Sequence, residues 1–243
     1  MTIGKSRILA VVPARGGSKG IPGKNLRVVG GTSLVGHAAS ICAALPELDA
    51  SILSTDDSKI VAEGTKHGLD APFLRPDEFS GDTASSADMW RHAWLSAEAH
   101  YGMQFDFSVL LEPTSPMRRA GDVRTTLEML ISGNHAAAAT VSPTPAHYAP
   151  QKTLTVDAKG DLGFYDPADQ TARRQDIPPY YHRNGLCYAV RRETLVDRGH
   201  IIEEGCAAVI VARPVVNIDE PFDLELAEFL MTHAAKRTNE PTS

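Results

Sequence analysis

Near its N-terminus the chain passes from an apolar run, Ile8 to Val12, straight into a proline- and glycine-rich loop at positions 13–25. A short β-branched run without polar alternation predicts a strand that is buried on both faces of a sheet. Such a strand needs helices on both sides of its sheet. A glycine-rich loop after it can also bring backbone N–H groups together at a helix start, where they bind an anion.

The alternation of short strands with amphipathic helices continues as far as residue 142 and resumes near residue 184. The patterns predict strands at 50–54, 71–75, 107–111, 186–190 and 207–211, and helices at 33–45, 57–67, 85–100, 122–132 and 222–235. This order predicts an α/β, Rossmann-like fold with a mixed, mostly parallel sheet and helices on both faces. Its site is expected at the C-terminal ends of the strands.

Prolines at 143, 145, 150, 167, 178 and 179 interrupt the alternation. Within this stretch, positions 153–156 and 162–165 predict a hairpin that turns at Lys159-Gly160. The stretch is too long for a plain loop. We therefore predict an inserted lobe at 143–183, a main domain formed by 1–142 plus 184–237, and a frayed tail at 238–243.

Charge and cysteine content limit the class of protein. The formal net charge of −6 argues against broad affinity for nucleic acid or a membrane surface, so any phosphate needs a local site. The three cysteines are widely separated and suit a reducing compartment, and no histidine pair with a third ligand indicates zinc. No apolar run reaches the length of a signal peptide or a membrane span, so a cytoplasmic protein is expected.

The loop at 13–25 carries three cations, Arg15, Lys19 and Lys24, beside Gly16 and Gly17. This charge density, with glycines that allow close backbone approach, suits a triphosphate. Glycines alone would also suit a tight turn between strand and helix. The spacing matches neither the dinucleotide fingerprint nor the P-loop motif, and the chain has no G-x-S-x-G elbow of a hydrolase.

The loop sequence PARGGSKGIPGKN resembles the signature of the acylneuraminate cytidylyltransferases, the CMP-sialic acid synthetases. Further motifs follow in family order: STDD at 54–57, LRP at 74–76, LLEPTSPMR at 110–118, NGLCY at 184–188 and IDEPFD at 218–223. The resemblance covers nearly the whole chain. It implies a nucleotidyltransferase fold and the transfer of CMP from CTP to a sialic acid or related nonulosonic acid, with Mg²⁺ as cofactor and release of pyrophosphate.

The same resemblance assigns Arg15, Lys24 and Asp219 to catalysis, with the two cations holding the triphosphate and its transition-state charge. The other implied contacts to CTP are Gly16, Gly17, Lys19, Asn25, Arg75, Ser85 and Ser86. Without the resemblance, Arg75 would be interpreted as a surface arginine. The two serines would equally suit the N-cap of the following helix.

Asp219 is the predicted Mg²⁺ ligand, because one or two carboxylates with phosphate oxygens suffice for such a site. The family commonly has an Asp-x-Asp pair here, whereas this chain has Asn217 as the first member. The number of bound ions therefore stays open. Asp223 either compensates as a ligand or, as we favour, supplies negative charge at a helix N-terminus.

The acceptor side departs from the family at Glu112, where a glutamine near the sugar is usual. A carboxylate close to the acceptor's acid group would repel it but could accept hydrogen bonds from hydroxyls or an amide, so the preferred sugar is expected to differ from ordinary N-acetylneuraminate. Related acceptors include legionaminic, pseudaminic and other deoxy or diamino nonulosonic acids. The lobe resembles the family's dimerisation arm, which implies a homodimer whose acceptor pocket is lined by Arg173 or Arg174, Tyr181 and Asn184. A solvated basic turn over buried aromatics is the alternative.

Two other functions stay open. A related nucleotidyltransferase could use a different acceptor, including the eight-carbon acid Kdo, although Kdo synthetases lack this form of the loop. A CTP-binding regulatory module could keep the loop without turnover, which the departures at Asn217 and Glu112 make worth testing. The presence of Arg15, Lys24 and Asp219 favours the enzyme, with CTP and an acidic nine-carbon sugar as partners and neither nucleic acid nor membrane.

Overall fold

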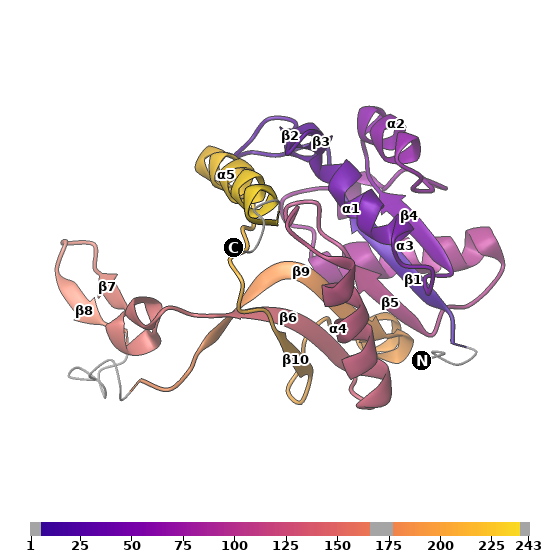
Figure 1. Ribbon diagram of the computed structural model, residues 1–243. Helices are drawn as coiled ribbons and strands as arrows, with labels where there is room; N and C mark the ends of the chain where they lie inside the picture. The colour runs from indigo at the N-terminus through magenta and orange to yellow at the C-terminus, as the bar shows by residue number, and fades with distance from the viewer. Residues whose placement is uncertain (1–5, 166–176, 239–243) are drawn as a thin grey trace.

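A mixed six-stranded sheet forms the centre of the molecule in the computed structural model, which describes residues 6–165 and 177–238 (Figure 1). The strand order is β10-β6-β9-β5-β1-β4, and β9 alone runs antiparallel to its neighbours, β5 and β6. The predicted mostly parallel sheet is confirmed. Its strands are β1 (Ile8–Pro13), β4 (Ala50–Ser54), β5 (Phe107–Leu110), β6 (Ala137–Pro143), β9 (Tyr181–Arg191) and β10 (Ala207–Ile210).

Both faces of the sheet are buried under helices, as the apolar run in β1 predicts. Ile8, Ala10 and Val12 join one core cluster, while Leu9 and Val11 join the other, and all five are buried. Alternate side chains of this strand therefore pack into two cores, one on each face of the sheet. The first core includes α1 (Leu34–Ala43), α2 (Ser58–Lys66) and α4 (Ala120–Ser132), and the second includes α3 (Ser86–Tyr101) and the short π-helix η7 (Glu193–Asp197).

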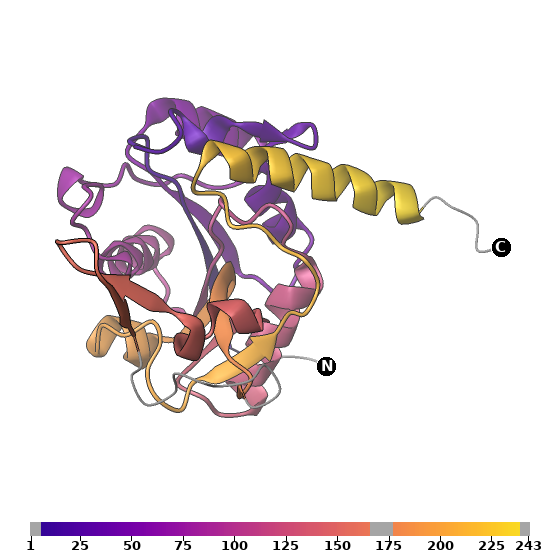
Figure 2. The ribbon, with the colours of Figure 1, turned by 90° about the vertical axis from the view of Figure 1, so that its left-hand side faces the viewer.

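A third, smaller cluster forms under α5 (Pro221–Thr238), which lies beside the hairpin β2 (Val28–Val29) and β3 (Thr32–Ser33) (Figure 2). The backbone N–H of Gly30 in this hairpin donates a 2.6 Å hydrogen bond to Glu228 of α5. This docking holds the segment before α5 against the loop after β1. A Cβ on Gly20 would lie only 2.7 Å from the carbonyl oxygen of Asp219, so the close approach requires glycine there.

A long arm leaves the sheet through β6 and β9, and the hairpin of β7 (Leu154–Val156) and β8 (Leu162–Phe164) stands away from the main body (Figure 1). The predicted hairpin is confirmed. Two short helices precede it, η3 (Ala146–Tyr148) and η4 (Pro150–Lys152). The predicted lobe limits fall inside the β6–β9 ladder, where Pro143 pairs with Tyr181 and Val141 with Arg183. The division into domains stays a prediction.

The predicted helices are present, and several begin one residue later than predicted because the first residue is the N-cap. Ser33, Asp57 and Ser85 each accept a backbone hydrogen bond in that role. One predicted strand is wrong: positions 71–75 are irregular, and only Asp70 forms an isolated bridge to β4. Pro72 lacks the N–H that a longer ladder would need. Among the described helices, none is both long and apolar enough to cross a membrane.

Candidate active site

A cleft of about 310 Å³ opens where the loops after β1 and β5 meet the segment that leads into α3, at the C-terminal ends of these two parallel strands. One wall is the loop after β1, a second is the segment from Arg75 to Met89, and the third is formed by residues 112–114. Seven of the predicted site residues line this cleft: Arg15, Lys24, Asn25, Arg75, Ser85, Ser86 and Glu112.

Two side chains hold the loop after β1 in place, one at the end of the loop itself and one after β4. Asn25 is buried and donates from Nδ2 to the carbonyl oxygen of Arg15 at 2.9 Å. The N–H of Gly16 donates to Asp56 after β4 at 2.7 Å. The role of Asn25 in this structure is therefore to brace the loop, and the backbone N–H of Gly16 is already engaged. Gly17 lies exposed beside it.

Arg15 and Lys19 both pair with Asp82, which lies in the loop before α3. The distances are 2.9 Å from Arg15 Nη1 and 2.7 Å from Lys19 Nζ, and these cations hold the pKa of the Asp82 carboxyl below its ordinary value. The three side chains are substantially exposed, so a phosphate group can compete for the cations. In this structure, Asp82 thus forms ion pairs with Arg15 and Lys19, the two cations that the family resemblance assigns to the triphosphate.

Lys24 connects the loop to the segment that carries the predicted metal ligands. Its Nζ donates to the carbonyl oxygen of Ile218 at 2.9 Å and to Asp219 Oδ1 at 3.1 Å. Asn217 Nδ2 donates to the other oxygen, Asp219 Oδ2, at 3.2 Å. Asp223 accepts hydrogen bonds from the N–H groups of Asp219 and Glu220, so the favoured helix-terminal role of Asp223 is the one that the structure shows.

The arrangement around Asp219 suits Mg²⁺ only when phosphate oxygens complete the coordination. Among the described residues, no group of three or more His, Cys, Asp and Glu is placed to hold a metal by itself. Asp219 is exposed and Asn217 offers an amide oxygen, which together supply few ligands. Mg²⁺ commonly binds through one or two carboxylates together with substrate phosphates and water, so the residues present fit such a site.

Arg75, interpreted from sequence alone as a surface arginine, is buried in the second wall. It donates to the carbonyl oxygen and hydroxyl of Ser54, the latter at 3.0 Å, and burial lowers its pKa to about 10. Ser85 caps α3: its hydroxyl accepts the N–H of Asp88 at 3.0 Å and donates to that carboxylate at 2.6 Å. Both residues still line the cleft.

Glu112 is the first residue of the third wall, and burial raises the pKa of its carboxyl above the ordinary value. Opposite it lies Gly185, which has φ of 70°. A Cβ at Gly185 would lie 2.8 Å from Ser115 Oγ, 3.1 Å from Glu112 Oε2 and 3.3 Å from Asn217 Oδ1. Three polar side-chain atoms therefore pack so closely against Gly185 that a side chain at this position has no room.

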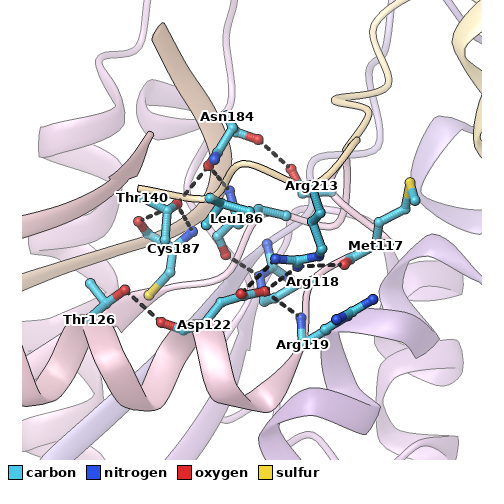
Figure 3. Close-up of polar contacts among 12 residues, drawn as sticks. Met117, Arg118, Arg119, Asp122, Thr126, Thr140, Asn184, Leu186, Cys187 and Arg213 are labelled. Atoms are coloured by element: carbon cyan, nitrogen blue, oxygen red, sulfur yellow. Dashed lines mark hydrogen bonds and ion pairs between the residues drawn. The ribbon is translucent and has the colours of Figure 1, made fainter. Parts of the chain in front are cut away.

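Beneath this wall, the buried guanidinium of Arg118 links the loop after β5 to β9 (Figure 3). Arg118 donates to the carbonyl oxygens of Glu112 at 2.6 Å, Gly185 at 3.2 Å and Leu186. Asn184 is buried nearby, and its amide is taken up by Thr140, Ser142 and the N–H of Leu186. Asn184 is thus placed in a structural network.

Of the other predicted acceptor residues within the described part of the chain, neither Asn184 nor Tyr181 lines the cleft. Tyr181 begins β9 at the base of the arm and is 46% exposed. Arg173 and Arg174 fall outside the described residues.

Sequence reasoning missed Asp56, Asp82 and Arg118. Asp56 stands in the quoted STDD motif and Arg118 ends the LLEPTSPMR motif, so both had a signal that was given no role. Asp82 carries no local signal, because its role depends on a chain reversal that brings it to Arg15 from 67 residues away.

Comparison with known proteins shows that this chain belongs to a known family. Residues 9–194 match the family model described as cytidylyltransferase. The chain is 29% identical over 233 residues to CMP-N,N'-diacetyllegionaminic acid synthase of Legionella pneumophila, covering 93% of this chain and 96% of that protein. It is 26% identical to pseudaminic acid cytidylyltransferase of Campylobacter jejuni, covering 91% and 95%.

A further relative is N-acylneuraminate cytidylyltransferase of Escherichia coli, 28% identical over 92% of this chain and 52% of that protein. Among solved structures, CMP:2-keto-3-deoxy-manno-octonic acid synthetase complexed with CTP superposes with a TM-score of 0.71 at 22% identity, covering 94% of this chain and 100% of that one. At that identity, the structural likeness supports the fold.

Proposed function

Since the chain belongs to the cytidylyltransferase family, we propose that it transfers CMP from CTP to a nonulosonic acid of the legionaminic, pseudaminic or sialic type. The observation that carries this proposal is the cleft itself, which Arg15, Lys24 and Arg75 line together with Glu112. Cations suit a triphosphate and a polar wall suits a sugar. The relatives named above support the acceptor class without selecting one member of it.

In the proposed reaction, a hydroxyl oxygen of the acceptor attacks the α-phosphorus of CTP in line with the departing pyrophosphate. The new P–O bond forms as the bond to the bridging oxygen breaks, pyrophosphate departs, and the hydroxyl proton passes from the acceptor to solvent water. Arg15 and Lys24 stabilise the charge that spreads over the phosphoryl oxygens. Lys19 is positioned to hold the outer phosphates once Asp82 is displaced.

For the cofactor we propose Mg²⁺, held by Asp219 with Asn217 beside it. When bound, Mg²⁺ would neutralise charge on the phosphate oxygens and orient the pyrophosphate. The protein's own contribution is to keep Asp219 in position, through Lys24 on one oxygen and Asn217 on the other. The N–H groups of Asp219 and Glu220 are fixed by Asp223.

A homodimer through the arm is the proposed assembly. Apolar and aromatic side chains are exposed on the arm. A two-stranded hairpin is only marginally stable by itself, and an exposed apolar patch marks a surface that another protein covers. The exposed side chains are Tyr148, Leu154, Val156, Leu162, Phe164 and Tyr165, each between 48% and 72% exposed. As the family resemblance implies, a partner's arm would also supply contacts to the acceptor.

The test is pyrophosphate release with CTP and Mg²⁺ across a panel of N,N'-diacetyllegionaminate, pseudaminate, N-acetylneuraminate, ketodeoxynonulosonate and Kdo. Release with any of the nine-carbon acids supports the proposal, and the ranking identifies the acceptor. Preference for Kdo would indicate the eight-carbon alternative. Tight CTP binding without release for any acceptor would favour the regulatory module instead.

A further inference from the structure

We propose that His92 of α3, which does not line the cleft, positions the cleft residue Arg75 by holding the two aromatic rings that flank it in sequence, and that it does so only as a neutral imidazole. This inference rests on the proposed function, because the family resemblance assigns Arg75 to CTP. His92 lies in none of the motifs that carry that resemblance. It is a positioning residue, which acts on the nucleotide through Arg75.

The wall segment that carries Arg75 has little regular structure of its own. Positions 71–75 are irregular, and η2 (Asp77–Phe79) is a single short turn. Arg75 is the only buried residue from position 71 to position 88. The shape of this wall therefore depends on the side chains that attach it to the main body. Phe73 and Phe79 do so, because both pack against the core that lies under α3.

One imidazole contacts both of these rings. His92 stacks on Phe79 with ring centroids 4.7 Å apart and 29° between the ring planes, and it meets Phe73 edge-on at 5.4 Å and 86°. Phe73 precedes Arg75 in the chain and Phe79 follows it. Phe79 also lines the cleft, and its carbonyl oxygen accepts from Arg75 Nη1 at 3.5 Å. A displacement of the imidazole would therefore be passed to Arg75 from both sides.

The surroundings of His92 suit the uncharged ring. Its Nε2 lies 3.4 Å from Ser96 Oγ, whereas its Nδ1 is buried with no hydrogen-bond partner in the described part of the chain. The charged ring carries a proton on both nitrogens, so it would bury an N–H group without an acceptor. A cation stacked on Phe79 would gain some attraction to the ring face, but that contact supplies no acceptor for the buried N–H.

The charged groups around His92 oppose its protonation on balance. Arg75 and Glu78 of the wall act on the imidazole, and Asp88 and Arg91 of α3 line the same small pocket. Burial, followed by the positive charge of Arg75, lowers the pKa of His92 below its ordinary value, and Glu78 opposes this shift to a smaller extent. The stability that the neutral ring contributes is therefore complete above about pH 6.5, the ordinary pKa of histidine, and is lost as the pH falls toward the lower pKa of the folded state.

The test measures the Kd for CTP by isothermal titration calorimetry between about pH 7.5 and pH 5.5, where an imidazole titrates. His92→Phe keeps a ring that can stack but cannot be charged, so it should bind CTP like the wild type at the upper pH. On acidification the wild type should lose about two- to fivefold more affinity than this variant. His100→Phe, which removes a half-exposed histidine of the same helix, is the matched control and should keep the wild-type profile. The phosphates of CTP also titrate in this range, but they do so equally for all three proteins.

A second variant tests the stack itself. His92→Ala removes the ring and should raise the Kd for CTP about tenfold at the upper pH, a loss that phenylalanine at the same position rescues. Circular dichroism checks that each variant is folded. The same acid profile in the wild type and His92→Phe, or wild-type affinity in His92→Ala, would overturn the inference alone. A folded wild type that binds no CTP at any pH would refute the proposed function, and the inference with it.

Discussion

Arg15 Nη1 lies 2.9 Å from Asp82 Oδ1, so the arginine that we propose for catalysis is held by a carboxylate of its own chain. The other oxygen of Asp82 accepts from Lys19 at 2.7 Å. Asp82 thus holds both cations, and it places a negative charge at the site that we propose for the triphosphate. Because the three side chains are exposed, the pairing is weak enough for CTP to displace it.

Replacing Asp82 by Asn should therefore tighten CTP binding, by about three- to tenfold at low ionic strength, since the competing charge is removed. Isothermal titration calorimetry measures the Kd directly. Asp77→Asn, an exposed carboxylate of η2 (Asp77–Phe79), controls for the change in net charge. Weaker CTP binding in Asp82→Asn would mean that Asp82 prearranges the cations more than it competes for them.

Lys24→Ala should reduce turnover by about a hundredfold or more while the fold stays intact. Its ammonium group contacts Asp219 and the Ile218 carbonyl, and its loss removes both a phosphate ligand and the link to the metal-binding segment. Pyrophosphate release measures the loss, and circular dichroism checks the fold. Lys59→Ala, an exposed position of α2, should behave as wild type. Near-normal activity of the Lys24 variant would contradict the mechanism.

The main architecture was predictable because its signals are local. The run from Ile8 to Val12 has the pattern of a doubly buried strand, and N-caps such as Ser33 and Asp57 mark helix starts within a residue. The wrong strand at 71–75 shows the limit of this reasoning. A short apolar segment has the same pattern whether or not a neighbour is available to pair with it, and Pro72 restricts pairing here.

The sequence motifs predicted which residues line the cleft, but they did not predict side-chain contacts that depend on the tertiary structure. Arg15, Lys24 and Asn25 of the loop after β1 line the same cleft as Glu112, while their roles toward a substrate stay predictions. The involvement of Asn25 in bracing Arg15, and of Asn184 in a buried network with Thr140, depends on which chain segments the fold brings together. Residue type alone does not distinguish an amide that binds a ligand from one that binds the backbone.

Arg118→Met should destabilise the protein by about 3 kcal/mol or more, because buried carbonyl oxygens at Glu112, Gly185 and Leu186 would lose their charged donor. Urea denaturation measures the free energy of unfolding. Arg119→Met at the adjacent, exposed position is the matched control and should change it little. A small effect of Arg118→Met would show that the two strands are held together without this guanidinium.

Leu162→Asp combined with Phe164→Asp should convert the proposed dimer into monomers, since both side chains are exposed on the hairpin of the arm, at 72% and 48%. Burying two new carboxylates in an apolar interface is costly, so association should weaken strongly while each chain keeps its fold. Sedimentation velocity measures the mass. Val28→Asp, at an apolar position of β2 that is 64% exposed, is the control and should leave the mass unchanged. If acceptor contacts come from the partner's arm, the monomer should also show a raised KM for the acceptor and an unchanged Kd for CTP. A dimer that persists in the arm variant would place the interface on another surface.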